Sequence, residues 1–312
     1  MNEGGYLQLH LARGIGPATV RQVLARLTQT GVSLDEFLRL PSGEQVGRFG
    51  LARYQAEALH VARAEVERTH AELQQRGVAL LTPTSPEYPE RLQRRLRDQS
   101  PLLLYAWGNL DLLQGKAVGF CGARNASEKG IVVAEDCARQ IASWGWVVVS
   151  GGARGVDTAV HKAALAVGGT TVIVLPEGIL RYRLRLEESS VSRERVLLLS
   201  EFPPYMTWSV ASAMQRNRTV CGLSEAMIVI ESGLSGGTFE AGKLALNFKM
   251  PLFVADYAEP AVSAAGNAYF LARGARSLRR SVETGQANLE PLRRAVGAHS
   301  EMDMIAVQER LF

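Results

Sequence analysis

Three short apolar runs in the sequence are each followed by glycines with small polar or basic residues beside them. These residues are Gly122 and Arg124 after the first run, Ser150, Gly151 and Gly152 after the second, and Ser235, Gly236 and Gly237 after the third. Glycine lets a backbone approach a ligand closely, and the free N–H groups at the start of a helix attract anions. The repeated pattern predicts a cradle for phosphate groups; ordinary strand-to-helix turns without a ligand are the alternative.

A basic segment, Arg216-Asn217-Arg218, lies within a predicted helix over residues 209–222. Side chains two positions apart on a helix diverge by about 200°, so only one of the two arginines is expected to face the glycine-rich segments. An arginine there would bind phosphate as a planar fork, and Asn217 could hydrogen-bond a base edge or a backbone. A solvated helix surface without a ligand is the alternative.

One histidine, His161, follows the candidate helix cap Asp157 by one helical turn. A histidine packed inside the protein, or capping a helix, is favoured over a catalytic one at this position.

The elements that must position these segments repeat between residues 116 and about 280. Continuous β-branched runs, typical of parallel strands buried on both faces, alternate with amphipathic helical stretches. The runs span residues 117–121, 147–150, 171–175, 196–199, 226–230 and 252–255, and the helices span about 128–144, 157–167, 209–222 and 238–248. The pattern predicts an α/β fold with a doubly wound parallel sheet, in which ligands bind beyond the carboxyl ends of the strands.

The chain of 312 residues is long enough for about two domains. Residues 1–84 are predicted to form an N-terminal helical domain, because apolar residues recur there at helical spacing and a proline-containing stretch follows at 82–86. Residues 85–280 are predicted to form the α/β domain. Residues 281–312 are predicted to form a short C-terminal extension, with a reduced helical module as the alternative.

Composition and charge narrow the function classes. The chain is 46% hydrophobic and 21% charged, which excludes wholesale disorder, a fibrous repeat and a small disulfide-stapled scaffold. Its net charge is +4 and only five of its 35 basic residues are lysines, so a polyanion partner is plausible; arginine richness through genomic base composition is the alternative. The G-x-G-x-x-G pattern of dinucleotide-binding proteins is missing, so neither an NAD enzyme nor any other cofactor is expected.

The three cysteines, Cys121, Cys137 and Cys221, are odd in number and widely spaced. This spacing predicts no zinc or other metal site and no oxidising compartment. The N-terminus lacks the apolar core of a signal peptide, and no apolar run approaches the roughly 20 residues that span a bilayer. A cytoplasmic protein without a membrane partner is expected.

Taken together, the motifs resemble the DNA-processing protein A family, also called DprA or Smf, over about residues 80–280. The longest match, S-G-G-A-R-G-V-D-T-A-V-H-K-A-A-L at 150–165, is similar to the family's S-G-x-A-x-G-I-D-x-x-A-H-x-x-A-L. Shorter matches are Y-P-E-R-L at 88–92, G-A-R at 122–124, S-E-F-P-P at 200–204, R-N-R at 216–218 and G-L-S at 222–224.

The resemblance implies an extended Rossmann-like domain that binds single-stranded DNA in a basic pocket. It also implies loading of the recombinase RecA onto that DNA during natural transformation or recombination, a homodimer, and no catalysis. Carried over motif by motif, the DNA-binding residues that it implies are Arg124, Ser150, Gly151, Gly152, Arg216, Asn217, Arg218, Ser235, Gly236 and Gly237.

The chain departs from the family pattern at several points. Met214-Gln215 stand where the family usually has a proline before R-N-R, and the segment 175–180 lacks the aspartate of L-G-x-G-x-D. The segment S-G-G-T-F-E-A at 235–241 leans toward the G-G-x-G-T-x-x-E loop of the related "lonely guy" nucleotide phosphoribohydrolases. The alternative function is therefore such an enzyme, or a nucleotide-binding relative, with Glu240 as acid/base near an arginine. The family's usual C-terminal winged-helix domain is not expected after residue 280, because too few residues follow.

Two flanking segments carry further resemblances. The segment A-R-G-I-G-P-A-T at 12–19 resembles the hairpin of helix-hairpin-helix modules, in which Gly14 and Gly16 would make a secondary contact to a DNA phosphate. A structural helical hairpin or a protein-binding module is the alternative. The final residues, Q-E-R-L-F, resemble a sliding-clamp-binding peptide with Gln308, Leu311 and Phe312 as anchors; packing of Leu311 and Phe312 on the protein itself is the alternative.

Overall fold

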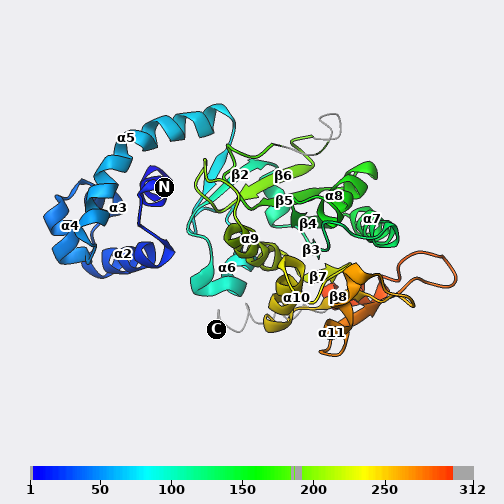
Figure 1. The fold of residues 1–312 in the computed structure, drawn as a ribbon. Helices are drawn as coiled ribbons and strands as arrows, with labels where there is room; N and C mark the ends of the chain where they lie inside the picture. Colours follow the sequence, from blue (N-terminus) through cyan, green and yellow to red (C-terminus); the bar gives the residue numbers. More distant parts are fainter. Residues whose placement is uncertain (1–2, 184–185, 187–191, 298–312) are drawn as a thin grey trace, which may run out of the picture.

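The fold is that of a computed structural model, which describes residues 3–183, 186 and 192–297. A nine-stranded sheet with the order β1-β2-β6-β5-β4-β3-β7-β8-β9 forms its centre (Figure 1). The strands are β1 (Ala79–Leu81), β2 (Leu104–Gly108), β3 (Ala117–Cys121), β4 (Val147–Gly151), β5 (Thr171–Leu175), β6 (Val196–Ser200), β7 (Ala226–Val229), β8 (Leu252–Ala255) and β9 (Arg276–Leu278). All neighbouring pairs from β6 to β9 are parallel, whereas β1 and β2 run antiparallel at one edge. The predicted α/β fold with a doubly wound, mostly parallel sheet is confirmed.

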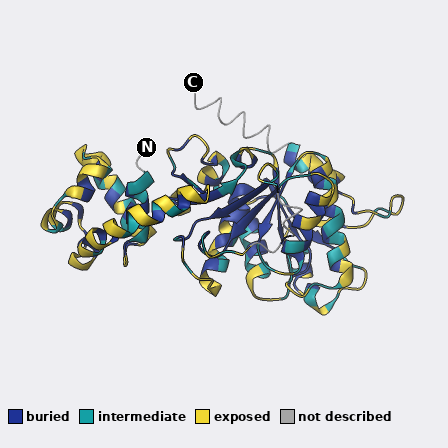
Figure 2. Cartoon of the chain, turned by 90° about the horizontal axis from the view of Figure 1, so that it is seen from above, coloured by how far each residue is buried: buried dark blue, intermediate teal, exposed yellow. Residues whose placement is uncertain are grey.

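Helices cover both faces of this sheet, which is buried along its central strands (Figure 2). One face carries α6 (Glu90–Leu96), α9 (Val210–Leu223), α10 (Gly237–Asn247) and α11 (Asn267–Leu271), and the other carries α7 (Glu128–Ser143) and α8 (Val156–Ala166). Successive strand residues point to opposite faces, so Val148 packs in the core below α7 and α8 while Val149 packs in the core below α9. Burial on both faces explains why the central strands are continuous apolar runs.

The N-terminal helices form a core of their own and stand to one side of the sheet (Figure 1). They are α1 (Glu3–Leu11), α2 (Pro17–Thr30), α3 (Leu34–Arg39), α4 (Ser42–Phe49) and α5 (Arg53–Gln75). Leu7 of α1 and Leu73 of α5 pack with Tyr105 of β2 at the sheet edge. His10 Nδ1 lies 2.8 Å from the Tyr105 hydroxyl. The helices are therefore joined to the sheet through apolar packing and a hydrogen bond.

Three strands lie where the sequence predicted none. β1 lies inside residues 1–84, which were predicted to be helical, and β2 lies in a segment predicted only as a connection. β1 and β9 have three residues each, too few to show a period, and all three strands lie toward the sheet edges. Residues 290–297 are helical and bury Leu292 and Val296 in the α7 face of the sheet. This described part of the predicted C-terminal extension therefore packs on the main core.

Helices α6 and α9 approach closely because Gly222 of α9 has no side chain. A Cβ atom at Gly222 would lie 2.3 Å from Leu92 Cδ1 of α6. By contrast, a Cβ atom at Gly47, inside the α4 helix, would meet nothing within 4 Å.

We predict that Gly222→Ala lowers the free energy of unfolding by about 1–2 kcal/mol, because overpacking outweighs the gain in helix propensity. Gly47→Ala, the matched control, should raise it by about 0.5–1 kcal/mol. Urea denaturation of both variants measures the two changes. A stabilised Gly222→Ala variant would contradict the close packing of α6 on α9.

Candidate functional site

The strand order reverses at β3, because the chain runs outward from β3 to β6 and returns to β7 on the other side of β3. Ligands of open α/β sheets usually bind in the crevice at such a point. Here the fully buried carboxylate of Glu231, just after β7, occupies it. This carboxylate accepts hydrogen bonds from the backbone N–H of Ser127 (2.9 Å), from the Ser127 hydroxyl and from the Ser263 hydroxyl (2.6 Å).

The first predicted phosphate cradle is therefore corrected. Ser127 caps α7, accepting a hydrogen bond from Gly130 N at 3.0 Å. The anion beside this helix start is the protein's own Glu231, since a carboxylate is stabilised there as a phosphate would be. The loop after β3 thus contributes Arg124 to the surface, but no open helix N-terminus.

The second predicted cradle, after β4, is also filled from within. Ser150 is fully buried, and its hydroxyl lies 2.9 Å from both Phe120 O and Asp157 Oδ1. A Cβ atom at Gly151 would lie 1.5 Å from Arg216 Nη1, and one at Gly152 would lie 3.1 Å from the Tyr182 hydroxyl. The two glycines make room for the protein's own side chains, so this loop supports Arg216 and does not form an open cradle.

Arg216 is the most unusual charged group of the site. Its side chain is 9% exposed, and its only described ion pair is with Asp157, at 3.7 Å. Its Nε atom is buried and has no hydrogen-bond partner among the described residues. Burial lowers the pKa of Arg216, the Asp157 carboxylate raises it, and the neighbouring charge of Arg124 lowers it. A buried guanidinium so sparsely paired is costly, and an added anion would relieve that cost.

Arg124 lies at the surface beside this buried arginine. Its guanidinium carbon is 5.5 Å from the centre of the Trp208 ring, and Trp208 is 44% exposed. The two guanidinium groups and the exposed indole thus combine a phosphate-binding charge with a surface on which a base could stack.

The third loop, before α10, is the open one. Ser235, Gly236 and Gly237 are exposed. Gly236 has a φ of +92° and precedes α10 without any side-chain cap. Asn217 of α9 donates a hydrogen bond to Gly237 O at 3.1 Å, which ties the loop to the R-N-R helix. Exposed arginines of the loops after β4 and β5 extend the basic surface; they are Arg154, Arg181 and Arg183.

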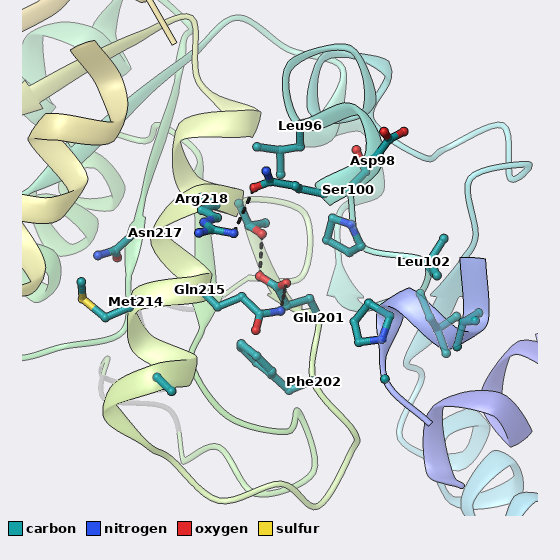
Figure 3. A pocket seen from close by; sticks show the side chains of 18 of the residues that line it. Leu96, Asp98, Ser100, Leu102, Glu201, Phe202, Met214, Gln215, Asn217 and Arg218 are labelled. Carbon is teal, nitrogen blue, oxygen red and sulfur yellow. Dashed lines mark hydrogen bonds between the residues drawn. The ribbon is translucent and has the colours of Figure 1, made fainter. Parts of the chain in front are cut away.

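Arg218 points away from Arg216, as their helical spacing predicted. It is exposed and donates a hydrogen bond to Gln99 Oε1 at 3.0 Å, on the 3-10 turn η1 (Arg97–Gln99). There it lines a cavity of about 820 Å³ between the N-terminal helices, α9 and α10 (Figure 3). Gly16 and Asn217 line the same cavity, whereas Gly14 lies against the ring of Tyr54. The structure therefore separates Arg218 from the glycine loops and brings it together with Gly16.

His161 is packed inside the protein, as predicted. It is 2% exposed, and its ring nitrogens lie 2.6 Å from Thr171 Oγ1 and 2.8 Å from Gly151 O. It links the end of β4, where Gly151 packs against Arg216, to Thr171 of β5.

Glu240, the acid/base of the alternative enzyme, pairs with Lys243 at 3.1 Å. No described ion pair joins it to an arginine, so the arrangement expected for that chemistry is not found in this part of the chain.

Within residues 3–297, leaving aside 184–185 and 187–191, no group of three or more His, Cys, Asp or Glu could hold a metal ion. Over the same residues, no helix combines the length and apolar character needed to cross a membrane. The predicted clamp anchors Gln308, Leu311 and Phe312 lie outside the described residues.

Four residues of the site escaped the sequence interpretation: Trp208, Tyr182, Glu231 and Glu201. Trp208 could have been found from the sequence, since an aromatic residue stands there between the matched motifs at 200–204 and 216–218. Glu201 lies in the matched segment S-E-F-P-P at 200–204 without a role having been assigned to it, and Glu231 follows a strand as an ordinary acidic residue. Only the sheet topology reveals the neighbours of both.

Comparisons with known proteins bear on the family and the fold of the chain. The family model of DNA recombination-mediator protein A matches residues 79–287. The DNA processing protein DprA of Bacillus subtilis is 31% identical over 177 residues, which cover 56% of this chain and 59% of that protein. This chain spans about half the length of the curated relatives that it matches.

Two solved structures are similar in fold. DprA of Streptococcus pneumoniae superposes with a TM-score of 0.73 and 23% identity, covering 89% of this chain and 95% of that one. A structure of DNA processing protein A from Helicobacter pylori, described for its single-stranded DNA binding mode, gives a TM-score of 0.55 and 26% identity. That match covers 64% of this chain and 90% of the other.

The burial of His161 makes a prediction about pH. Burial lowers the pKa of His161 in the folded protein, whereas the unfolded chain has the ordinary value of about 6.5. The unfolded state therefore binds the proton first as the pH falls below about 6.5, and the free energy of unfolding decreases. We predict that His161→Gln costs about 1–3 kcal/mol at pH 7.5 through lost hydrogen bonds, but loses less further stability between pH 7.5 and 5.5 than wild type. Urea denaturation at both pH values measures this, with the exposed His60→Gln as control; equal pH dependence in wild type and His161→Gln would contradict it.

Proposed function

Because the chain belongs to the DNA recombination-mediator protein A family, we propose that it binds single-stranded DNA at the carboxyl end of its sheet. Phosphates lie against Arg216, Arg124 and the open loop Ser235–Gly237, and bases lie near Asn217 and on Trp208. A further phosphate of the same strand lies against Arg218, which faces the cavity beyond Asn217. The observation that carries the proposal is the buried and sparsely paired guanidinium of Arg216 beside Arg124. The named binding mode of the Helicobacter pylori relative supports the choice of a single strand.

Positively charged grooves with exposed aromatic rings suit single strands, because every base can stack on an aromatic face. Here Trp208 and Tyr205, 44% and 42% exposed, precede the R-N-R helix. A duplex hides its base faces, so this surface favours unpaired bases. Ser150, Gly151 and Gly152 act in this proposal through the position of Arg216, since the first two are buried.

The bound strand is then passed to RecA, and the chain works as a homodimer in the cytoplasm. The description of the matching family as a recombination mediator supports the first part. In this proposal the chain is not an enzyme, so mass spectrometry of nucleoside monophosphates incubated with it should detect no released base.

We predict that Arg124→Ala and Arg218→Ala each weaken binding of a single-stranded oligonucleotide several-fold. Each should also reduce the slope of log affinity against log salt by about 0.7, because a strand that contacts one arginine fewer releases one fewer counterion on binding. Arg63→Ala, on the exposed side of α5, is the matched control and should bind like wild type. Fluorescence anisotropy over rising salt measures both quantities, and wild-type binding by Arg124→Ala and Arg218→Ala at every salt concentration would refute this site.

We further predict that the wild-type chain speeds assembly of RecA on a single strand, and that Arg124→Ala loses most of this effect. RecA-dependent ATP hydrolysis on the oligonucleotide follows the assembly. An undiminished effect in a variant that no longer binds the strand would contradict handover from this surface.

A further inference from the structure

We propose that the cavity between the N-terminal helices and α9 receives one base of the bound strand, and that Glu201 favours bases with an exocyclic amino group. This inference rests on the proposed single-strand binding and extends it to a second place on the protein. The cavity of about 820 Å³ lies within the range of about 300–1,000 Å³ that is typical of small-ligand pockets.

The cavity adjoins the proposed strand site through one helix. Asn217 of α9 donates to Gly237 O in the open loop and also lines the cavity. Arg218, the next residue, lies on the cavity side (Figure 3). A strand that leaves the open loop over Asn217 therefore meets the cavity next, with Gly16 of the N-terminal hairpin on its far wall.

The exposed rim of the cavity carries cations together with the acids Asp98 and Glu240, of which Glu240 pairs with Lys243. The carboxylate of Glu201 lies deeper. Arg218 is exposed and the Lys243 side chain is 40% exposed. Glu201 is 8% exposed and Phe202 is 5% exposed. A nucleotide has the same division, because its phosphate is anionic and its base is neutral and largely apolar on its faces. A nucleotide that places its phosphate on the outer cations and its base inward matches both parts of the cavity. A phosphate placed inside would be repelled by the Glu201 carboxylate.

Glu201 supplies hydrogen-bond acceptors at the inner wall. Its Oε1 accepts from Thr219 Oγ1 at 2.6 Å, and its Oε2 accepts from Gln215 Nε2 at 2.7 Å (Figure 3). These two donors fix the orientation of the carboxyl group. Burial raises the pKa of Glu201 above its ordinary value, and the two hydrogen bonds and the nearby arginines offset only part of that rise. An ionised carboxylate has about four lone-pair sites, so it has acceptors left for a ligand.

A base is then read at its amino group. Cytosine presents its N4 amino group as a donor, and a carboxylate accepts from that group. Uracil carries a carbonyl oxygen at the same position, which the carboxylate would repel. Cytosine and uracil have the same ring and differ at this edge. A comparison of the two therefore separates the hydrogen bond to Glu201 from the contribution of base stacking.

The test compares single strands of deoxycytidine and deoxyuridine, 20 nucleotides long, on the full chain by fluorescence anisotropy at one salt concentration. We expect the cytosine strand to bind about tenfold more tightly, the size of one good base contact. Glu201→Gln should remove most of this preference with little change in binding of the uracil strand. Leu244→Trp, which narrows the cavity from α10, should remove it without touching the carboxylate. Val132→Trp, exposed on α7 across the sheet, is the matched control and should keep it.

Equal affinity of wild type for the two strands, or a preference that survives in both Glu201→Gln and Leu244→Trp, would overturn the inference and leave single-strand binding intact. Failure to bind either strand would instead refute the proposed function. Should Glu201→Gln fail to fold, Leu244→Trp against Val132→Trp decides alone.

Discussion

A positive charge held inside the protein is the constraint on which the site depends. Arg216 is buried against Gly151, its carboxylate partner is 3.7 Å away, and its Nε atom has no described hydrogen-bond partner. Each nearby feature follows from accommodating it. Gly151 must be glycine because a Cβ would overlap the guanidinium group. Asp157 must face it, and His161 must hold the loop that carries Gly151. The long S-G-G-A-R-G-V-D-T-A-V-H motif is thus the support of one arginine contributed by a distant helix.

The crevice at β3, where many α/β proteins bind their ligands, is filled in this protein by a side chain of its own. Glu231 satisfies the start of α7, so no phosphate is needed there. The open backbone N–H groups are found instead at α10, next to the helix that carries Arg216 and Asn217. In the proposed function the phosphates therefore lie on a broad surface and not in a narrow crevice, and such a surface suits a chain of phosphates better than one nucleotide.

The sequence allows prediction of the central strands and four main helices, because burial on both faces leaves continuous apolar runs and helices keep their period. It also allows prediction that Arg216 and Arg218 diverge, since that follows from helical geometry alone. It does not reveal which glycines are exposed and which are buried, because Gly151 and Gly236 look alike in sequence. One makes room for a side chain more than 60 positions away, and only the fold shows this. Short edge strands such as β1 cannot be predicted for a different reason, because three residues are too few to show a periodic pattern of apolar residues.

The contacts between the N-terminal helices and the sheet have a thermodynamic consequence. Arg21 of α2 donates to Ser100 O at 2.8 Å, and His10 contacts Tyr105. The N-terminal helices and the sheet domain thus both contribute walls to one cavity. Any molecule that touches both walls stabilises their association, and by linkage a tighter association strengthens its binding by the same factor. The N-terminal helices would then regulate affinity. The strength of their association with the sheet, rather than the chemistry of their own side chains, would set how long a ligand stays bound.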